Sequence, residues 1–282
     1  MPEPTKVNVV SYGGVKPGQL VVGSTRDGGK TTLFDAATVE DGANALYGKA
    51  NLTSWDVELP ELKRAGDMFH GCSGLTSWDV ELPELEYGYQ MFYDCSGLTA
   101  WNVDMNSLTD SRYMFRGCTG LTTWDADLKS LTDCDYMYSG DTGLTTWNGD
   151  LDALEDADHM FNGCSRLTTW NGYVPNLKDG RYMFRWCTSL TTWNGDLGAL
   201  ESGVDMFDHC VLSAESALRV LETIPNRAEA GLAEAPLTIG MRTNWVPGTQ
   251  GYEELKAMLG VSADTIAAGT YHIAKGWAVT VQ

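Results

Sequence analysis

The sequence predicts a solenoid, a chain wound into stacked coils with a short parallel β-sheet along one side. Three observations support this fold class: a tryptophan recurs every 23 residues, a methionine recurs at the same step, and seven copies follow one another without insertion. A fixed period of this length is typical of repeat proteins, whose units bury their apolar side only against their neighbours. The two columns are Trp55, Trp78, Trp101, Trp124, Trp147, Trp170 and Trp193, and Met68, Met91, Met114, Met137, Met160, Met183 and Met206.

The repeat unit is approximately L-T-x-W-[DN]-x-x-[LMV]-x-x-L-x5-M-F-x-x-C-x-x. Its W-D-V-E-L stretch alternates apolar and polar residues, which predicts a strand with one buried face. Seven such strands, about 4.8 Å apart, would form a parallel sheet roughly 30–35 Å long, with the M-F-x-x-C segments on the opposite side. The fold class is therefore mainly β or α/β.

The Leu-x-x-Trp opening and the later M-F-x-x-C turn are similar to a leucine-rich repeat. Over residues 32–212 the M-F-x-G-C-x-x-L-T-x-W segments resemble the BspA-type leucine-rich repeats of bacterial surface proteins. A phage-encoded member of that family is one interpretation of this resemblance. The chain departs from that pattern in having Trp where the family has Leu or Ile, and in Asp141, which interrupts the cysteine column. The resemblance implies surface adhesion and ligand recognition rather than catalysis.

Four segments follow from the period: an N-terminal β cap or attachment segment (1–31), a degenerate first repeat (32–51), seven repeats (52–212) and a C-terminal α/β cap (213–282). KVNVV and QLVVG around Gly13–Gly14 predict a hairpin in the first segment. In the last segment, Ser213 is expected to cap a helix that ends at Pro225. A strand at PLTIG, helical stretches near 251–259 and 263–275, and a strand at WAVTV are expected to follow.

Composition narrows the partners and the location. The chain has 38 acidic and 19 basic residues, a net charge of −19, which disfavours nucleic acids and anionic lipid surfaces. No run reaches the 18 apolar residues of a membrane span, and MPEPTKVNVV does not resemble a secretory signal. We expect no membrane insertion. The resemblance favours a cell surface or a virion, a cytosolic location stays open, and the oligomeric state is not predicted.

Motifs for catalysis and metal binding are weak. GSTRDGGKTT has Ser24 where a phosphate-binding loop needs its first glycine, and no His-Glu-x-x-His spacing occurs. Parallel columns bring cysteines into a geometry that fits disulfides poorly, so a buried thiol ladder is expected. The sequence therefore predicts no enzyme and no required cofactor. The cysteine column is Cys72, Cys95, Cys118, Cys164, Cys187 and Cys210, with Cys134 outside it.

The tryptophan column has two interpretations, a stacking platform for sugars or part of the core, and its inward position favours the core. Its indole N–H groups then need partners such as a neighbouring threonine or carbonyl. The acidic residues after it also have two interpretations, a Ca²⁺-binding column or a solvated face that aids solubility. The candidate Ca²⁺ column is Asp79, Glu81, Asp104, Asp125, Asp127 and Asp150.

The positions around each methionine vary while the columns beside them stay fixed. Their side chains are mostly Tyr, Arg, Asp, His, Asn, Ser and Gly with one Trp, a composition typical of antibody-like binding surfaces. We therefore predict a ligand-binding face there. Its candidate residues are His70, Tyr87, Tyr89, Tyr93, Arg112, Tyr113, Arg116, Asp135, Tyr136, Asp158, His159, Asn162, Arg181, Tyr182, Arg185, Trp186 and Asp208.

Two residues after the methionine, every residue is one that an Asn codon could reach by changing only its adenines. This pattern suggests diversification by a retroelement that mutates adenines, a hypothesis that codon comparison can test. The predicted function is non-catalytic recognition of a protein or glycan on a cell surface. The alternatives are a phage tail receptor-binding protein and an intracellular interaction scaffold. The positions are His70, Tyr93, Arg116, Ser139, Asn162, Arg185 and Asp208.

Overall fold

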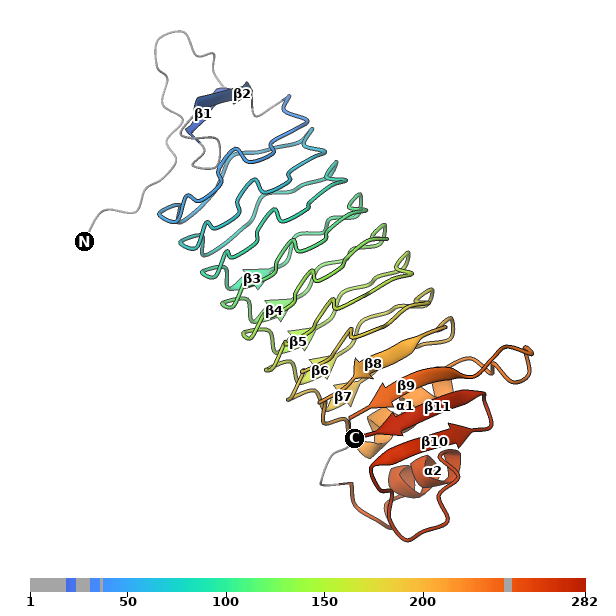
Figure 1. Ribbon diagram of the computed structural model, residues 1–282. Coiled ribbons are helices and arrows are strands. Elements are labelled where there is room, and N and C mark those ends of the chain that lie inside the picture. Colours follow the sequence, from blue (N-terminus) through green and yellow to red (C-terminus); the bar gives the residue numbers. More distant parts are fainter. Residues whose placement is uncertain (1–18, 24–30, 36–37, 241–244) are drawn as a thin grey trace.

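The computed structural model describes residues 19–23, 31–35, 38–240 and 245–282. It confirms the predicted fold class, a repeat solenoid with a parallel sheet (Figure 1). A hairpin lies at the N-terminal end of the stack and an α/β unit at the C-terminal end. The five-stranded parallel sheet consists of β3 (Ala100–Trp101), β4 (Thr123–Trp124), β5 (Thr146–Trp147), β6 (Thr169–Trp170) and β7 (Thr192–Trp193).

The predicted strand is wrong in its position, its length and its number of copies. Each assigned strand ends at the tryptophan instead of beginning there, spans two residues, and occurs in five coils rather than seven. Past the tryptophan, the chain turns back on its own side chain: the indole of Trp124 donates to the carbonyl of Ala126, 2.7 Å away, and Trp78 does the same to Val80. The strands also end at Trp170 and Trp193, whose indoles have no hydrogen-bond partner, so this bond accompanies the turn in the coils with Val or Ala and does not by itself end the strand.

A second ladder holds the coils together on the methionine side. The N–H of Phe69 donates to the carbonyl of Met91 in the next coil, at 2.9 Å, and Phe92 does so to Met114. Between these bonds, alternate N–H groups close tight turns within the coil, as from Met114 to the carbonyl of Ser111. Backbone groups therefore alternate between the turn and the neighbouring coil, which leaves few of them unsatisfied along the stack.

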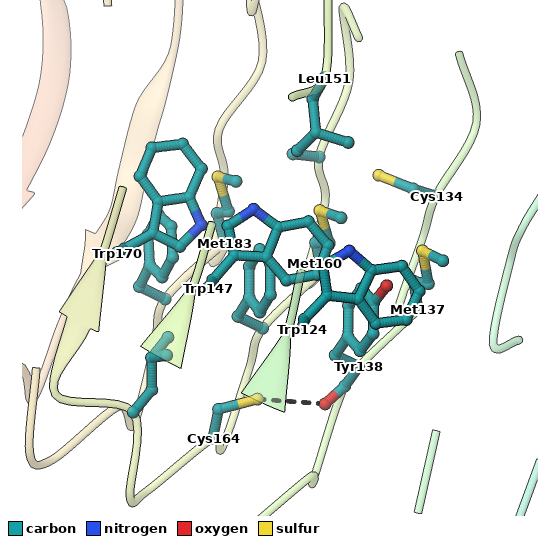
Figure 2. Packing of buried hydrophobic residues seen from close by; sticks show 14 of the residues in the cluster. Trp124, Cys134, Met137, Tyr138, Trp147, Leu151, Met160, Cys164, Trp170 and Met183 are labelled. Carbon is teal, nitrogen blue, oxygen red and sulfur yellow. Dashed lines mark hydrogen bonds between the residues drawn. The ribbon is translucent and has the colours of Figure 1, made fainter. Parts of the chain in front are cut away.

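The core consists of stacked columns of identical side chains (Figure 2). The tryptophans of the seven repeats are at most 4% exposed, so the core interpretation of that column is confirmed. All seven cysteines are free and buried, which confirms the thiol ladder. Each column cysteine donates to a carbonyl of an earlier coil, as Cys164 does to Tyr138 at 3.1 Å. Burial raises the pKa of the thiols of Cys72, Cys95, Cys118, Cys134, Cys164 and Cys187, to about 12 for Cys72, which makes them poor nucleophiles.

Three coils carry glycine two residues after the tryptophan, where the others have Val or Ala. A Cβ at Gly172 would collide with the ring of Trp170, so the indole occupies the space of the missing side chain. The indole nitrogens of Trp170 and Trp193 then have no hydrogen-bond partner, unlike that of Trp124. The expectation of a carbonyl partner therefore holds for the coils with Val or Ala and fails for these two.

Asp141 is the polar exception in the core. It stands in the cysteine column, is fully buried, and neither carboxylate oxygen has a hydrogen-bond partner. Tyr138, in the same coil, replaces a phenylalanine and also has an unpartnered hydroxyl. Desolvation raises the pKa of Asp141 well above its ordinary value, with the thiol of Cys164 adding to it. Burial therefore favours the neutral form of this carboxyl group over its charged form.

The C-terminal unit continues the last coil. Strand β8 (Gly203–Phe207) contains that coil's Met-Phe pair and lies beside β9 (Ala235–Ile239) in a sheet of order β10-β11-β9-β8. Ser213 caps α1 (Ala214–Thr223) by accepting from the N–H of Ser216, as predicted. The remaining elements are α2 (Gln250–Met258), β10 (Gly269–Ile273) and β11 (Trp277–Val281).

One prediction near the C-terminal end is wrong. The stretch 263–275 was expected to be helical, but it contains β10, whose Thr270, Tyr271 and Ile273 favour a strand and which pairs antiparallel with β11. At the other end, QLVVG forms β1 (Gln19–Gly23), which pairs with β2 (Thr31–Asp35), a strand that extends into the segment assigned to the first repeat. KVNVV, Gly13 and Gly14 lie outside the described residues.

Candidate functional site

We call the side chains two and one residues before, and two and three residues after, each methionine the variable face. The methionine and the following phenylalanine point into the core, and these neighbours stand on the outside of the same turn. The predicted residues are exposed or half-buried, with one exception. They are His70, Tyr89, Tyr93, Arg112, Tyr113, Arg116, Asp135, Tyr136, Asp158, His159, Asn162, Arg181, Tyr182, Arg185 and Trp186, with Tyr87 exposed four residues before Met91.

The exception is Asp208, whose side chain is 4% exposed. Its carboxylate accepts from Arg185 Nε at 2.9 Å, and its other oxygen lies 2.7 Å from His209 Nδ1. The prediction that Asp208 presents itself to a ligand is therefore wrong. The physical reason is that the guanidinium of Arg185 compensates the burial at one oxygen, whereas Oδ1 has no hydrogen-bond partner, so Asp208 supports the face from beneath.

Two of the four variable positions have a left-handed backbone. The residue before the methionine has φ of 57° in Tyr113, Tyr136 and His159 and 55° in Tyr182. The residue three after the methionine is glycine in most coils but Trp186, with φ 64°, in one of them. Left-handed backbone costs a non-glycine residue about 1–2 kcal/mol. Large aromatic residues at such positions indicate that something other than stability maintains them.

These aromatic side chains form a continuous stack across four coils. The rings of Tyr113 and Tyr136 are 5.1 Å apart and nearly parallel, those of Tyr136 and His159 are 4.4 Å apart, and those of His159 and Tyr182 are 4.5 Å apart. Each ring is half-buried, with one edge toward solvent. We call Tyr113, Tyr136, His159 and Tyr182 the outer stack.

A second stack joins the first. Two residues after the methionine, Tyr47, His70 and Tyr93 have ring centroids 4.5 and 4.6 Å apart. The guanidinium of Arg116 lies 5.6 Å from the ring of Tyr93 and 5.8 Å from that of Tyr113, and it donates to the Tyr93 hydroxyl. Arg116 therefore links the two stacks by cation–π contacts, and the stripe runs without interruption from Tyr47 to Tyr182.

The stripe ends in a cluster of five residues. Arg185 lies 5.5 Å above the ring of Tyr182 and is held by the buried Asp208. His209 Nδ1 lies 2.7 Å from the other oxygen of Asp208, and its ring stacks on the indole of Trp186 at 3.7 Å. We call Tyr182, Arg185, Trp186, Asp208 and His209 the Trp186 cluster.

Aspartates border the stripe, and part of their role is structural. Asp110 accepts from the backbone N–H of Arg112 and from its guanidinium, at 2.7 Å for the closest pair, and Asp179 accepts from the N–H of Arg181. Such Asx turns fix the chain just before the variable positions. Desolvation, followed by repulsion from Asp133 and other neighbours, raises the pKa of Asp135 to about 6.

The acidic column on the tryptophan side has a structural explanation. Asp104 accepts from the N–H of Asp127 in the next coil at 2.9 Å, and Asp127 accepts from Asp150 in turn. Asp125 accepts from the amide of Asn148 at 2.7 Å, while Asp79 and Glu81 are exposed. Within the described residues, no group of three His, Cys, Asp or Glu is placed to hold a metal ion. The column therefore stabilises coil stacking by accepting hydrogen bonds.

Sequence reasoning missed two members of the stripe, Tyr47 and His209. Both could have been found by the 23-residue step, because Tyr47 precedes His70 and His209 follows Trp186 in their columns. Tyr47 lies in the degenerate repeat and His209 in the last coil, where the consensus is weakest. The link that Arg116 makes between the two stacks could not be predicted from the sequence, because it depends on how far the arginine side chain extends toward Tyr93 and Tyr113.

Comparisons with known proteins concern the fold. No protein-family model matches the chain. No curated protein matches its sequence either. Among solved structures, the chain is similar to a leucine-rich repeat protein from Bacteroides ovatus, at 17% identity and a TM-score of 0.45, over 81% of this chain and 65% of that one. It is also similar to the functional domain of InlJ from Listeria monocytogenes, which includes a cysteine ladder, at 15% identity and a TM-score of 0.26.

The InlJ match covers 71% of this chain and 53% of that domain, so the chain spans less than two thirds of either solved structure. In the part of the chain that the structure describes, neither helix has the length and apolar character needed to cross a membrane.

Proposed function

We propose that this protein is a non-catalytic recognition protein that binds a partner protein through the variable face. The observation that carries the proposal is the continuous stripe of rings and guanidinium groups on a left-handed backbone. Glycine would relieve the backbone strain at each position, yet the chain retains Tyr, His and Trp there. Tyr, Trp and Arg are also the residues that contribute most to binding energy at protein interfaces.

The scaffold suits this role. Stacked rings have few rotamers left to lose, so ordering them on binding costs little conformational entropy. The core beneath them is built from side chains that each contact their own copy in the next coil, so outer residues can change without disturbing it. The face can therefore vary from coil to coil while its geometry stays constant.

We place the partner on a cell surface, as an adhesin or a phage tail receptor-binding protein would require. This placement is supported by the resemblance of the M-F-x-x-C repeats to bacterial surface proteins. An intracellular interaction scaffold would use the same face and the same chemistry. Transcription with neighbouring tail or secretion genes would separate these roles.

Diversification by adenine mutagenesis is part of the same proposal. The codons two residues after each methionine encode His70, Tyr93, Arg116, Ser139, Asn162, Arg185 and Asp208. Most of these side chains lie at the surface, where replacement leaves the core columns unchanged. Related genes should differ at these codons mainly at adenines; differences spread evenly over all bases would contradict the idea.

The test of the function compares two opposite faces. A variant with Tyr113→Ala, Tyr136→Ala and Tyr182→Ala removes most of the outer stack, and a control with Thr123→Ala, Thr146→Ala and Thr169→Ala alters the sheet side. Both are applied, with the parent, to an array of cell-surface proteins and to a glycan array. We expect protein targets that the parent and the control bind and the stack variant does not. Targets lost by the control and kept by the stack variant would place the binding site on the sheet side and contradict the proposal.

A further inference from the structure

The chain contains its own comparison for the Trp186 cluster. RYMFRGCTGLTTW at 112–124 and RYMFRWCTSLTTW at 181–193 share the tyrosine and both arginines. They differ at Gly117, which becomes Trp186, and at Gly120, which becomes Ser189; in the next coil Ser139 and Gly140 correspond to Asp208 and His209, and Asp135 and Tyr136 correspond to Val204 and Asp205. Three of these changes, at Trp186, Asp208 and His209, fall on neighbouring positions of one surface patch.

The backbone at these positions favours glycine. The position three residues after the methionine, or after Ala45 in the first coil, is glycine in five of eight coils. The other three residues at this position are Asp94, Trp186 and His209. Trp186 and His209 have φ of 64° and 61°. Two adjacent bulky residues at left-handed positions indicate a site maintained for its contacts.

The indole of Trp186 is covered on one side only. His209 stacks on it from the following coil, at 3.7 Å and an interplanar angle of 20°. In the preceding coil the column residue is Gly163, which has no side chain to cover the other face. The tryptophan remains 45% exposed, as one of the few exposed large hydrophobic residues among those described.

The buried carboxylate orders one side of the cluster. Asp208 accepts from Arg185 Nε, and Arg185 lies over the ring of Tyr182; His209 Nδ1 lies 2.7 Å from the other carboxylate oxygen, and its ring stacks on Trp186. A buried carboxylate bonded to a guanidinium fixes the position of that group. In the first copy, Ser139 and Gly140 supply neither the carboxylate nor the ring.

Charge indicates the partner. Arg185 and Asp208 compensate each other, so the exposed part of the cluster is an aromatic platform without net charge. Asp205 is among the charges that act on Arg185, Asp179 is paired with Arg181 at 2.7 Å, and the chain's net charge of −19 gives the surroundings a negative potential. A protein that places an apolar side chain on Trp186 would meet this negative potential, which favours Lys and Arg next to that side chain.

We propose that the Trp186 cluster is the energetic centre of the variable face, and that it binds a basic protein segment through an aromatic or large apolar side chain. This inference rests on the proposed function and assigns most of its binding energy to one end of the stripe. The first copy of the motif, at 112–118, has the same tyrosine and arginines and contributes much less.

The experiment selects random linear peptides, displayed on yeast, for binding to the full chain. Synthetic versions of the enriched peptides are then titrated against Trp186→Gly, Asp208→Ser and His209→Gly, each of which installs the residue of the first copy. We expect enriched peptides to combine Lys or Arg with Trp, Tyr, Phe or Leu. Trp186→Gly should weaken them about thirtyfold, the other two variants less, and added salt should weaken binding further.

Folding controls are built into these variants. Because glycine suits the left-handed backbone, Trp186→Gly and His209→Gly should melt at the parent's temperature or above it, so lost binding reports lost contacts. Tyr113→Ala with Arg116→Ala, in the first copy, should weaken the same peptides only a fewfold.

The outcomes separate this inference from the proposed function. Peptides that tolerate Trp186→Gly but are lost in the first-copy variant would overturn the inference and leave the function standing. Peptide binding that neither the Trp186-cluster variants nor the first-copy variant weakens would overturn both the inference and the proposed function. Enrichment of acidic peptides, no enrichment at all, or binding to a glycan array that depends on Trp186 would overturn the basic-protein partner.

Discussion

Two ladders of stacked rings run along this molecule, one inside and one outside. The inner ladder is made by the residue after each methionine, from Phe69 to Phe207, with neighbouring centroids 5.2–5.6 Å apart. The outer stack, from Tyr113 to Tyr182, has spacings of 4.4–5.1 Å. The coil repeat sets both spacings, so ring stacking at the surface follows from the same backbone that stacks the core.

The two ladders differ in how freely their members vary. The inner ladder is phenylalanine in every repeat but one, where Tyr138 stands, whereas its outer counterpart contains Asp67, Gln90, Tyr, His159 and Asp205. A buried ring must fill its space at close packing, and a ring at the surface need not. The scaffold therefore separates the residues that maintain the fold from those available for recognition.

The largest expected effect comes from matched alanine substitutions in the two ladders. Phe161→Ala, fully buried, should lower the free energy of unfolding by about 3–5 kcal/mol, because it leaves a cavity in the stack. Tyr136→Ala, half-buried, should cost under about 1.5 kcal/mol. Urea unfolding followed by tryptophan fluorescence measures both. Equal losses would mean that the outer stack also maintains the fold.

The next largest effect concerns the polar exception in the core. Asp141→Cys should raise the free energy of unfolding at neutral pH by about 1–3 kcal/mol, because the new thiol can donate to the carbonyl of Phe115, as its column neighbours do. The raised pKa of Asp141 means that the parent loses stability as pH rises above about 4, the unfolded pKa, toward the folded value.

The variant should lack that part of the pH dependence. Thermal melting from acidic to neutral pH gives the comparison, with Cys187→Ala as a control that removes a column thiol which is not among the groups that shift the pKa of Asp141. A variant less stable than the parent at neutral pH would show that Asp141 has a partner that compensates its burial.

The sequence is sufficient to predict the inner ladder and not the outer one. Identical residues at a 23-residue step define the core columns directly, and the burial of Trp124, Phe115 and Cys118 follows. The strand was misplaced because apolar–polar alternation does not reveal that each two-residue strand ends at its tryptophan, as β4 does at Trp124. Likewise, Asp208 shares its column with half-buried residues, and its burial beside Arg185 could not be predicted from that column.

A smaller effect tests the left-handed backbone of the variable face. Gly140 has φ of 81° and open space where a Cβ would lie, so Gly140→Ala isolates backbone strain and should cost about 1 kcal/mol. Trp186→Gly, in the same column, should leave stability unchanged or raise it by up to about that amount. Urea unfolding of both proteins measures the pair. A tolerated alanine together with a destabilising Trp186→Gly would mean that the cluster is maintained for stability.

The smallest expected effect lies in the carboxylates that border the outer stack. The pKa of Asp135 is raised to about 6 by desolvation first and then by repulsion from Asp133, Asp156 and Asp158. Its charge therefore opposes folding, and its contribution should make the parent less stable as pH rises from about 4 to about 6, with no further change above. Asp135→Asn should remove this small loss, and carboxyl-carbon NMR of the parent should show the raised pKa directly. Solvent screens Asp135 but not Asp141, so the free-energy penalty from burial and like-charge repulsion should be several times smaller outside than inside. This difference is the physical reason that charges accumulate along the outer stack and are nearly absent from the inner ladder.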